Sequence, residues 1–137
     1  MSAPATEAWS LLIELWQGQR PRWPEAAAAV GLRPGQAQLL RLLDASEPVP
    51  MRRLACAMRC DPSNVTGLAD RLEERGLVER RADPADRRVK GLALTADGAE
   101  LRARFMEQLM EPPEEIASLS AADQRALRDA LRRTLGR

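Results

Sequence analysis

The apolar positions near the N-terminus follow the spacing of one helix face. Positions i, i+3, i+4 and i+7 of this stripe are occupied by Trp9, Leu12, Ile13 and Trp16. Thr6 is expected to begin the helix, and Leu11 and Leu15 widen its apolar face beyond what one small core needs. We therefore expect this helix to be covered on two sides, by its own domain and by a partner chain.

Prolines divide the middle of the chain into shorter elements. A helix is expected to open at Pro34, which suits a first helical position because its missing N–H has no partner there. Pro48 and Pro50 exclude a helix further along. Residues 51–60 are then expected to form a short helix, and the next helix is expected to start after a tight turn.

That next helix has an apolar face and a polar face. Asp61 can cap its free amides, Pro62 suits its first turn, and Gly76 is expected to end it in the left-handed conformation. The apolar face, again at helical spacing, comprises Val65, Leu68, Ala69 and Leu72. The opposite face collects Ser63, Asn64, Gly67, Asp70, Arg71 and Glu74.

Two strands are predicted over residues 77–82 and 89–94, with a loop rich in opposite charges between them. In the second strand, Leu92 and Leu94 are expected on one face. The other face is expected to hold Val89, Gly91 and Ala93.

Two more helices follow the strands. Thr95 is expected to cap the first, which carries an apolar stripe and stops at Pro112 and Pro113. Ser120, with an acid three residues later, is expected to begin the last. One side of that last helix collects Leu127, Leu131 and Leu135.

This order of elements predicts a mainly α fold, a winged helix-turn-helix with helical extensions. The 137-residue chain is one domain, in which residues 31–95 form a DNA-binding lobe and residues 6–30 and 96–137 form dimerisation helices.

Composition favours a binding protein over an enzyme. The chain has no His, which removes the commonest general base and metal ligand, and no catalytic or metal-ligating cluster replaces it, so neither a cofactor nor a metal is expected. It lacks an apolar run long enough to span a membrane and a signal sequence, so we expect a cytoplasmic protein. The net charge is +1 overall, but residues 51–90 carry ten basic side chains against seven acidic ones. The abundance of Arg and Ala is typical of a GC-rich bacterial genome.

Three segments together make the sequence resemble the multiple antibiotic resistance regulator (MarR) family. These are "GLRPGQAQLL", "LACAMRCDPSNVTGLADRLEERGLVER" and "DPADRRVKGLALTADG", which span about residues 31–100. The resemblance implies a DNA-binding transcriptional regulator, most often a repressor. Two positions depart from the family pattern: Arg59 stands where relatives often have Gly, and Arg33 where Ser or Thr often caps a helix.

The residues of the second short helix suit entry into a major groove. Ser63, Asn64 and Thr66 offer donors and acceptors, Gly67 lets the backbone come close, and Arg71 lies farther along the same face. For an isolated helix, an ordinary solvated surface would be the better interpretation; the neighbouring wing reverses that preference. Arg52 and Arg53, before the turn, are expected to hold phosphates.

The charged loop fits a wing that reaches into a minor groove. Arg87 or Arg88 would reach the groove, and Asp83 or Asp86 would brace the arginine through an ion pair. The family resemblance favours Arg88 as the groove residue and Asp86 as its brace. The alternative is a loop kept soluble by neutralising charge pairs.

One helix and one wing cover too few bases for selectivity, so we expect a homodimer that binds double-stranded DNA at a pseudo-palindromic operator. Its recognition helices would lie ~34 Å apart. The expected dimer contacts are Trp9, Leu12, Trp16, Leu127, Leu131 and Leu135. The resemblance also implies release by a small, often aromatic effector bound between the dimer helices and the DNA-binding lobe. Trp16 and Trp23 are candidates to line that cleft, although tryptophans are more often core residues.

Two other functions remain open at this stage. A winged helix can bind a partner protein instead of DNA, and a regulator can sense oxidants through cysteine. Cys56 and Cys60 lie one helical turn apart, where an intrachain disulfide is disfavoured, and we interpret both as small packing residues.

Overall fold

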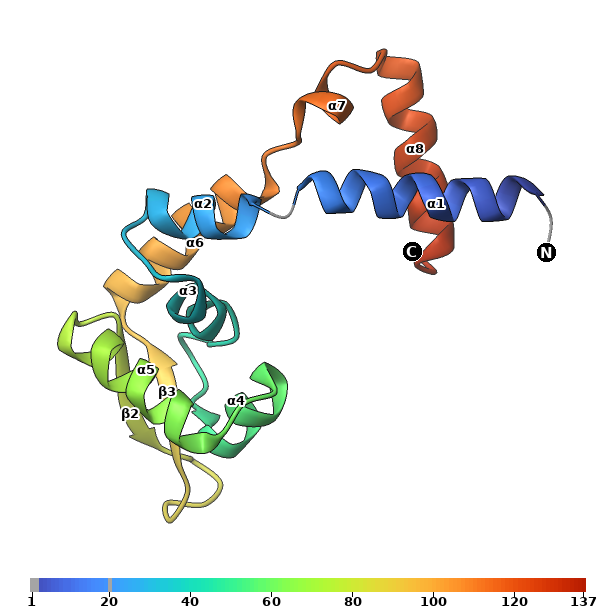
Figure 1. The fold of residues 1–137 in the computed structure, drawn as a ribbon. Coiled ribbons are helices and arrows are strands. Elements are labelled where there is room, and N and C mark those ends of the chain that lie inside the picture. The colour runs from blue at the N-terminus through green and yellow to red at the C-terminus, as the bar shows by residue number, and fades with distance from the viewer. Residues whose placement is uncertain (1–2, 20) are drawn as a thin grey trace.

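The computed structural model describes residues 3–19 and 21–137, and within them it confirms a mainly α winged helix-turn-helix (Figure 1). The helices are α1 (Ala3–Gly18), α2 (Arg22–Ala29), α3 (Pro34–Arg41), α4 (Met51–Met58), α5 (Pro62–Glu74), α6 (Ala96–Met110), α7 (Glu114–Ala117) and α8 (Ala121–Thr134). The strands are β1 (Val49–Pro50), β2 (Val78–Ala82) and β3 (Lys90–Leu94). α1 begins at Ala3 and so includes Thr6, which was expected to begin it. The sequence patterns did not predict α2, β1 or α7.

The three strands form a small antiparallel sheet in the order β1-β3-β2. β3 is the central strand, and Leu92, Ala93 and Leu94 are all buried. Both faces of this strand are therefore buried. Its second face is covered by the segment before β1, since a Cβ added at Gly91 would lie only 2.8 Å from the Cβ of Pro48.

The core lies where α2, α3, α4, α5 and α6 pack around the sheet. Its largest fully buried side chains include Phe105, Leu39, Leu54 and Leu72. Trp23 packs edge-on against the ring of Phe105, with 5.0 Å between the ring centroids, and its Nε1–H donates to the carbonyl of Pro34. Trp23 is thus a partly buried core residue that ties α2 to α3 and α6.

The turn between α4 and α5 is tight because Arg59 takes the left-handed conformation, with φ 51° and ψ 47°. Arg59 adopts the conformation that a glycine would adopt most easily. Pro62 begins α5 and Gly76 follows its end at φ +72°, as expected. Asp61 occupies the N-cap position, but its side chain makes no capping bond. Its main-chain carbonyl already accepts from the amides of Asn64 and Val65, and its carboxylate stays in solvent.

The start of α6 is held against the end of α5. The Thr95 hydroxyl accepts from the amide of Gly98, which confirms the predicted cap, and donates to the carbonyl of Gly76. A Cβ at Gly98 would lie 1.8 Å from the carbonyl oxygen of Leu77, so only glycine permits this approach. The contact fixes α6 relative to the strand that follows α5.

The terminal helices lie at the end of the molecule away from the sheet loop (Figure 1). Neither α1 nor α8 contains a buried residue within the described part of the chain. α6 ends at Met110 before Pro112 and Pro113, as predicted, and the chain turns through α7 into α8. In the described residues, no helix is long and apolar enough to span a bilayer.

Candidate nucleic-acid interface

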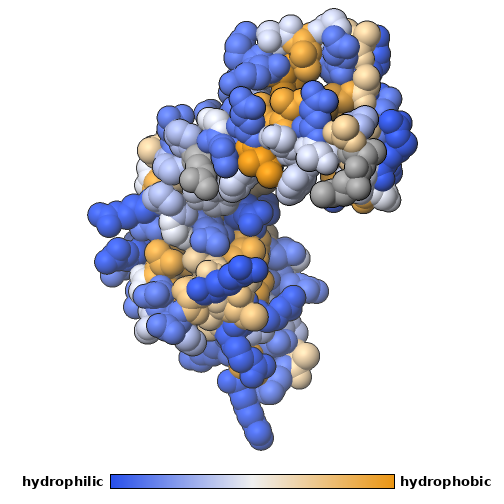
Figure 2. Space-filling model, turned by 45° about the vertical axis from the view of Figure 1, so that its right-hand side comes forward, coloured by the Kyte–Doolittle hydropathy of each residue, from blue (hydrophilic) through white to orange (hydrophobic). Residues whose placement is uncertain are grey.

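The ten residues expected to contact DNA are all exposed and lie on α4, α5 and the loop between β2 and β3. They are Arg52, Arg53, Ser63, Asn64, Thr66, Gly67, Arg71, Asp86, Arg87 and Arg88. These elements form the end of the molecule opposite α1 and α8 (Figure 1). Figure 2 shows a hydrophilic projection at that end.

The polar face of α5 points away from the core because Val65, Ala69 and Leu72 anchor its other face. Within the described residues, the side chains of Ser63 and Asn64 have no hydrogen-bond partner, so their donors and acceptors are available to a ligand. The Thr66 hydroxyl donates to the carbonyl of Pro62 at 3.0 Å, which leaves its oxygen to accept.

Neither the packing nor the backbone conformation of the chain requires a glycine at position 67. An added Cβ would meet nothing within 4 Å, and Gly67 is not among the glycines with positive φ. A glycine in the middle of a helix lowers stability relative to alanine. Its presence here fits a close approach by something outside the chain.

The aspartates of the loop shape its backbone instead of bracing an arginine. Asp83 Oδ1 accepts from the amide of Ala85 at 2.8 Å, and Asp86 Oδ1 accepts from the amide of Arg88 at 3.1 Å. Across the described parts of the chain, no ion pair joins either aspartate to Arg87 or Arg88. The predicted ion-pair brace is therefore absent here, because these carboxylates satisfy main-chain amides of tight turns. A bond between the Asp83 amide and the Val89 carbonyl closes the loop at 2.8 Å.

The arginines of the strands are paired, whereas those of the candidate interface are not. Arg80 forms ion pairs with Asp70 and Glu73, and Arg81 forms one with Glu79. The hydrogen bond that Arg80 donates to Asp70 raises the pKa of Arg80, so this guanidinium stays charged. In the portions of the chain described, no ion pair involves Arg52, Arg53, Arg59, Arg71, Arg87 or Arg88. These unpaired cations are free to meet phosphates.

Two residues at this surface were not singled out as contacts from the sequence. Arg59 is exposed at the turn and lines a hollow with Asn64. Gln38 of α3 lines a groove of about 400 Å³ together with Ser63, Asn64 and Arg71. The replacement of a turn glycine by arginine was the signal for Arg59. Nothing in the sequence pattern separates Gln38 from an ordinary half-buried helix residue.

The six residues expected in the dimer lie at the opposite end, on α1 and on α8 and its C-terminal cap. Trp9 is 65% exposed and Trp16 67%, which is unusual for such large apolar side chains. Leu12, Leu131 and Leu135 are also exposed and Leu127 is half-buried. Figure 2 shows hydrophobic side chains gathered at this end of the molecule.

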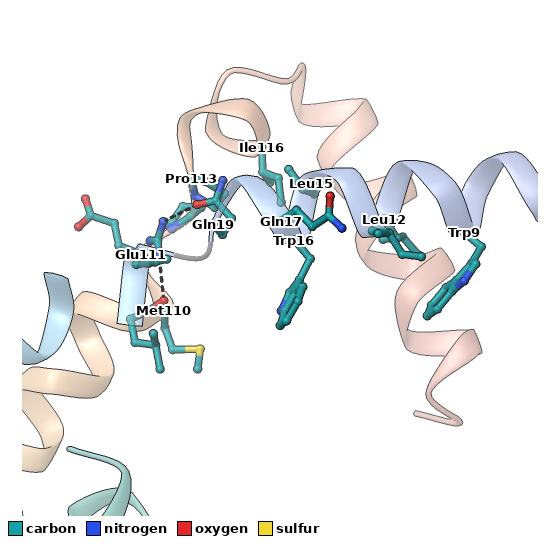
Figure 3. A pocket seen from close by; sticks show the side chains of 14 residues that line it. Trp9, Leu12, Leu15, Trp16, Gln17, Gln19, Met110, Glu111, Pro113 and Ile116 are labelled. Atoms are coloured by element: carbon teal, nitrogen blue, oxygen red, sulfur yellow. Dashed lines mark hydrogen bonds between the residues drawn. The ribbon is translucent and has the colours of Figure 1, made fainter. Parts of the chain in front are cut away.

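A cavity of about 880 Å³ opens beneath α1, between α1 and the chain that joins α6 to α7. Trp9, Leu12 and Trp16 line it from one side of α1 (Figure 3). Among the residues that the structure describes, its one cationic lining residue is Arg22, whose Nε–H donates to the carbonyl of Leu109. Trp16 thus lines this cavity, whereas Trp23 packs in the core.

Both cysteines are free thiols. Cys60 packs partly against the core, as expected, but Cys56 is exposed and has no packing role. Among the residues the structure describes, no group of three or more His, Cys, Asp or Glu side chains is arranged to hold a metal.

Comparison with known proteins agrees with this geometry. The model of the MarR family matches residues 32–90, from α3 through the loop. A protein assigned to transcriptional regulation of the hcr operon in Thauera aromatica is 32% identical over 131 residues, covering 92% of this chain and 79% of the relative. The HTH-type transcriptional repressor MdtR of Bacillus subtilis is 36% identical over 87 residues, covering 64% of this chain but only 56% of the repressor. The crystal structure of CouR from Rhodococcus jostii RHA1, bound to p-coumaroyl-CoA, is 30% identical with a TM-score of 0.65, covering 96% of this chain and 94% of CouR.

Proposed function

The chain belongs to the MarR family of DNA-binding transcriptional regulators, and we propose that it acts as a homodimeric repressor on a pseudo-palindromic operator. One observation carries the proposal: the molecule has unpaired arginines and a polar helix face at one end and uncovered apolar side chains at the other. The first surface suits a polyanion, and the second suits another copy of the chain.

In the proposed complex, α5 lies in a major groove. Ser63 and Asn64 contact base edges at its N-terminal end, while Arg71 contacts base edges or phosphate farther along. The loop of residues 83–89 lies in the adjacent minor groove, where Arg88 is the contacting residue. Arg52, Arg53 and Arg59 hold the phosphates that flank the α5 contacts.

The dimer supplies the selectivity that one protomer lacks. Two α5 helices related by a twofold axis read successive major grooves, about 34 Å apart on one face of the duplex. The exposed apolar faces of α1 and α8 support this assembly, because water contact with Trp9 and Trp16 is unfavourable in a monomer. A second copy of α1 and α8 would cover them.

Fluorescence anisotropy with duplex DNA tests this function against the alternative of a protein-interaction module. We expect binding whose affinity falls steeply as salt concentration rises, since each phosphate contact releases counterions. A protein that binds no duplex at low salt would contradict the proposal and favour a winged helix that recognises another protein.

We also propose that a small aromatic effector releases the DNA. The cavity beneath α1 supports this, because apolar side chains of α1 and of the chain that joins α6 to α7 line it and it has the size of a ligand site. CouR was crystallised with p-coumaroyl-CoA, which makes that compound a suitable first probe. A ligand acts this way only if it binds better to a helix spacing that misses the operator.

The effector is tested by adding p-coumaroyl-CoA and then free aromatic carboxylates to the protein–DNA complex. Met110 lines the cavity and is not among the proposed dimer contacts. Release that is weakened in Met110→Ala, with basal DNA affinity retained, supports an effector site beneath α1. Release that is equal in wild type and Met110→Ala would contradict a site there.

A further inference from the structure

We propose that Arg80 is a positioning residue for DNA recognition, which holds α5 at a fixed orientation to β2 by binding Asp70 and Glu73. The inference rests on the proposed DNA-binding function and adds to it a residue that touches no DNA. Arg80 belongs to the strand that leads into the loop, whereas both carboxylates belong to the helix proposed to enter the major groove.

Arg80 binds the two carboxylates through its two terminal nitrogens. One terminal nitrogen of Arg80 lies 2.6 Å from Asp70 Oδ1, and the other lies 2.6 Å from Glu73 Oε1. Asp70 and Glu73 are three residues apart, so they project from the same side of α5. A planar guanidinium can hold both carboxylates at once, which the single ammonium of lysine does less well.

Stability alone is a poor reason for this arrangement. Asp70 and Glu73 are 54% and 43% exposed, and ion pairs in such settings contribute only about 0–1 kcal/mol each. Two carboxylates on a helix that approaches DNA also carry an electrostatic cost, because the phosphates repel them. Their presence calls for a function that outweighs this repulsion.

Orientation of α5 is such a function. Hydrogen bonds hold the C-terminal end of the helix, where Arg75 donates to the carbonyl of Gly31 at 2.8 Å. The body of the helix is held by the apolar contacts of Val65, Ala69 and Leu72 on one face, and such contacts are not directional. The Arg80 bridge lies to one side of that face and resists rotation of α5 about its own axis. Small rotations would displace Ser63 and Asn64 from the base edges, while the loop that extends from β2 stayed in place.

For the DNA affinity of variants that lack the two carboxylates, the proposed role of Arg80 predicts the opposite of what charge alone predicts. Replacing Asp70 and Glu73 by Asn and Gln removes two negative charges from a DNA-binding helix, which by charge alone would tighten all DNA binding. If Arg80 acts through these carboxylates, the same double variant binds the specific duplex more weakly. Binding to nonspecific duplex is unchanged or tighter.

The experiment uses the full chain and the duplex that wild-type protein enriches from random DNA, with a scrambled duplex as the nonspecific probe. We expect D70N/E73Q to lose about tenfold in affinity for the enriched duplex and nothing for the scrambled one. Glu74→Gln is the matched control. It removes a negative charge from the same helix, and Glu74 has no ion-pair partner among the residues described. This control should not lose specific affinity.

Arg80 itself is tested by two substitutions. Arg80→Gln should weaken specific binding without lowering the salt slope, since Arg80 contacts no phosphate, and Arg80→Lys should restore little. A direct phosphate contact would instead reduce the slope by about one unit per protomer and be largely kept by lysine.

The outcomes separate three accounts. Specific affinity in D70N/E73Q that equals or exceeds the wild type would overturn the inference. Equal loss on both duplexes with a lowered melting temperature would also overturn it, because the bridge would then only stabilise the fold. Failure of the wild type to enrich any duplex would instead count against the proposed function.

Discussion

At the scale of single residues, glycine has three distinct roles in this chain. Gly98 permits a backbone contact with Leu77, Gly76 supplies a left-handed helix end, and Gly67 has neither requirement. The same substitution to alanine therefore has a different consequence at each position. The comparison distinguishes glycines required by the fold from one that suits a ligand.

Gly67→Ala should raise the free energy of unfolding by about 0.5–1 kcal/mol, because alanine is the better helix former and its Cβ meets nothing. It should nevertheless weaken DNA binding, since the added methyl group would stand between α5 and the duplex. Gly76→Ala is a control for which the opposite effect is expected. Because Gly76 has a φ of +72°, this substitution should lower the free energy of unfolding by about 1 kcal/mol or more. Urea unfolding measures the stability effect and fluorescence anisotropy measures the DNA affinity. A Gly67→Ala protein that binds DNA normally would exclude a close approach of the duplex to Gly67.

Arg88→Ala tests the loop. Loss of the Arg88 guanidinium should weaken duplex binding. It should also lower the slope of log affinity against log salt concentration by about one unit for each bound protomer, as expected when one ionic contact is removed. Arg104→Ala is a suitable control, because Arg104 is exposed on α6, far along the chain from the loop. Unchanged slope in Arg88→Ala would exclude this arginine from the interface.

Residue types were predicted better than their hydrogen-bond partners. The Thr95 and Ser120 caps follow from local sequence and are present, because both ends of each bond lie within one helical turn. The predicted ion pairs of Asp83 and Asp86 with an arginine of the loop are absent. Main-chain amides compete with the guanidinium groups for the same carboxylates. The bridge from Arg80 joins residues seven and ten positions apart, and only the packing of β2 on α5 brings them together.

At the scale of elements, the helices and the hairpin were predictable from apolar spacing, proline and glycine. The short elements were not. α2 spans eight residues, four of them alanine, and contains Pro24, a residue that normally indicates a break in a helix. β1 is a two-residue strand whose pairing with β3 depends on tertiary structure. The element boundary that matters most is the start of α6, where Thr95 and Gly98 join three segments.

Gly98→Ala should therefore destabilise the protein by about 3 kcal/mol or more, because the new Cβ cannot be accommodated 1.8 Å from a backbone oxygen. Thermal unfolding measures the loss. Ala99→Gly, one position along the same helix, should lower the free energy of unfolding by only about 1 kcal/mol, because glycine has a lower helix propensity than alanine. Similar losses in the two variants would mean that α6 can shift away from Leu77 at little cost.

At the scale of the whole molecule, the apolar surface on α1 and α8 defines the assembly. We expect the protein to sediment as a dimer, at twice its chain mass of 15.2 kDa, at micromolar concentration. A double substitution, Trp9→Glu with Leu12→Glu, should yield folded monomers, since neither residue is in the core. DNA affinity should fall with the dimer.

Ser10→Glu controls for added charge on the same helix, away from the apolar stripe, and should remain dimeric. Wild-type protein that sediments as a monomer would contradict the assembly. So would a double variant that still dimerises, because the contact would then lie elsewhere.

The most direct test of the central claim is selection of bound sequences from random duplex DNA by the wild-type protein. Two protomers that place α5 in successive major grooves should enrich an inverted repeat, with half-site centres about 10 base pairs apart or a multiple of a helical turn. Enrichment of a site without twofold symmetry, or of no site at all, would contradict it.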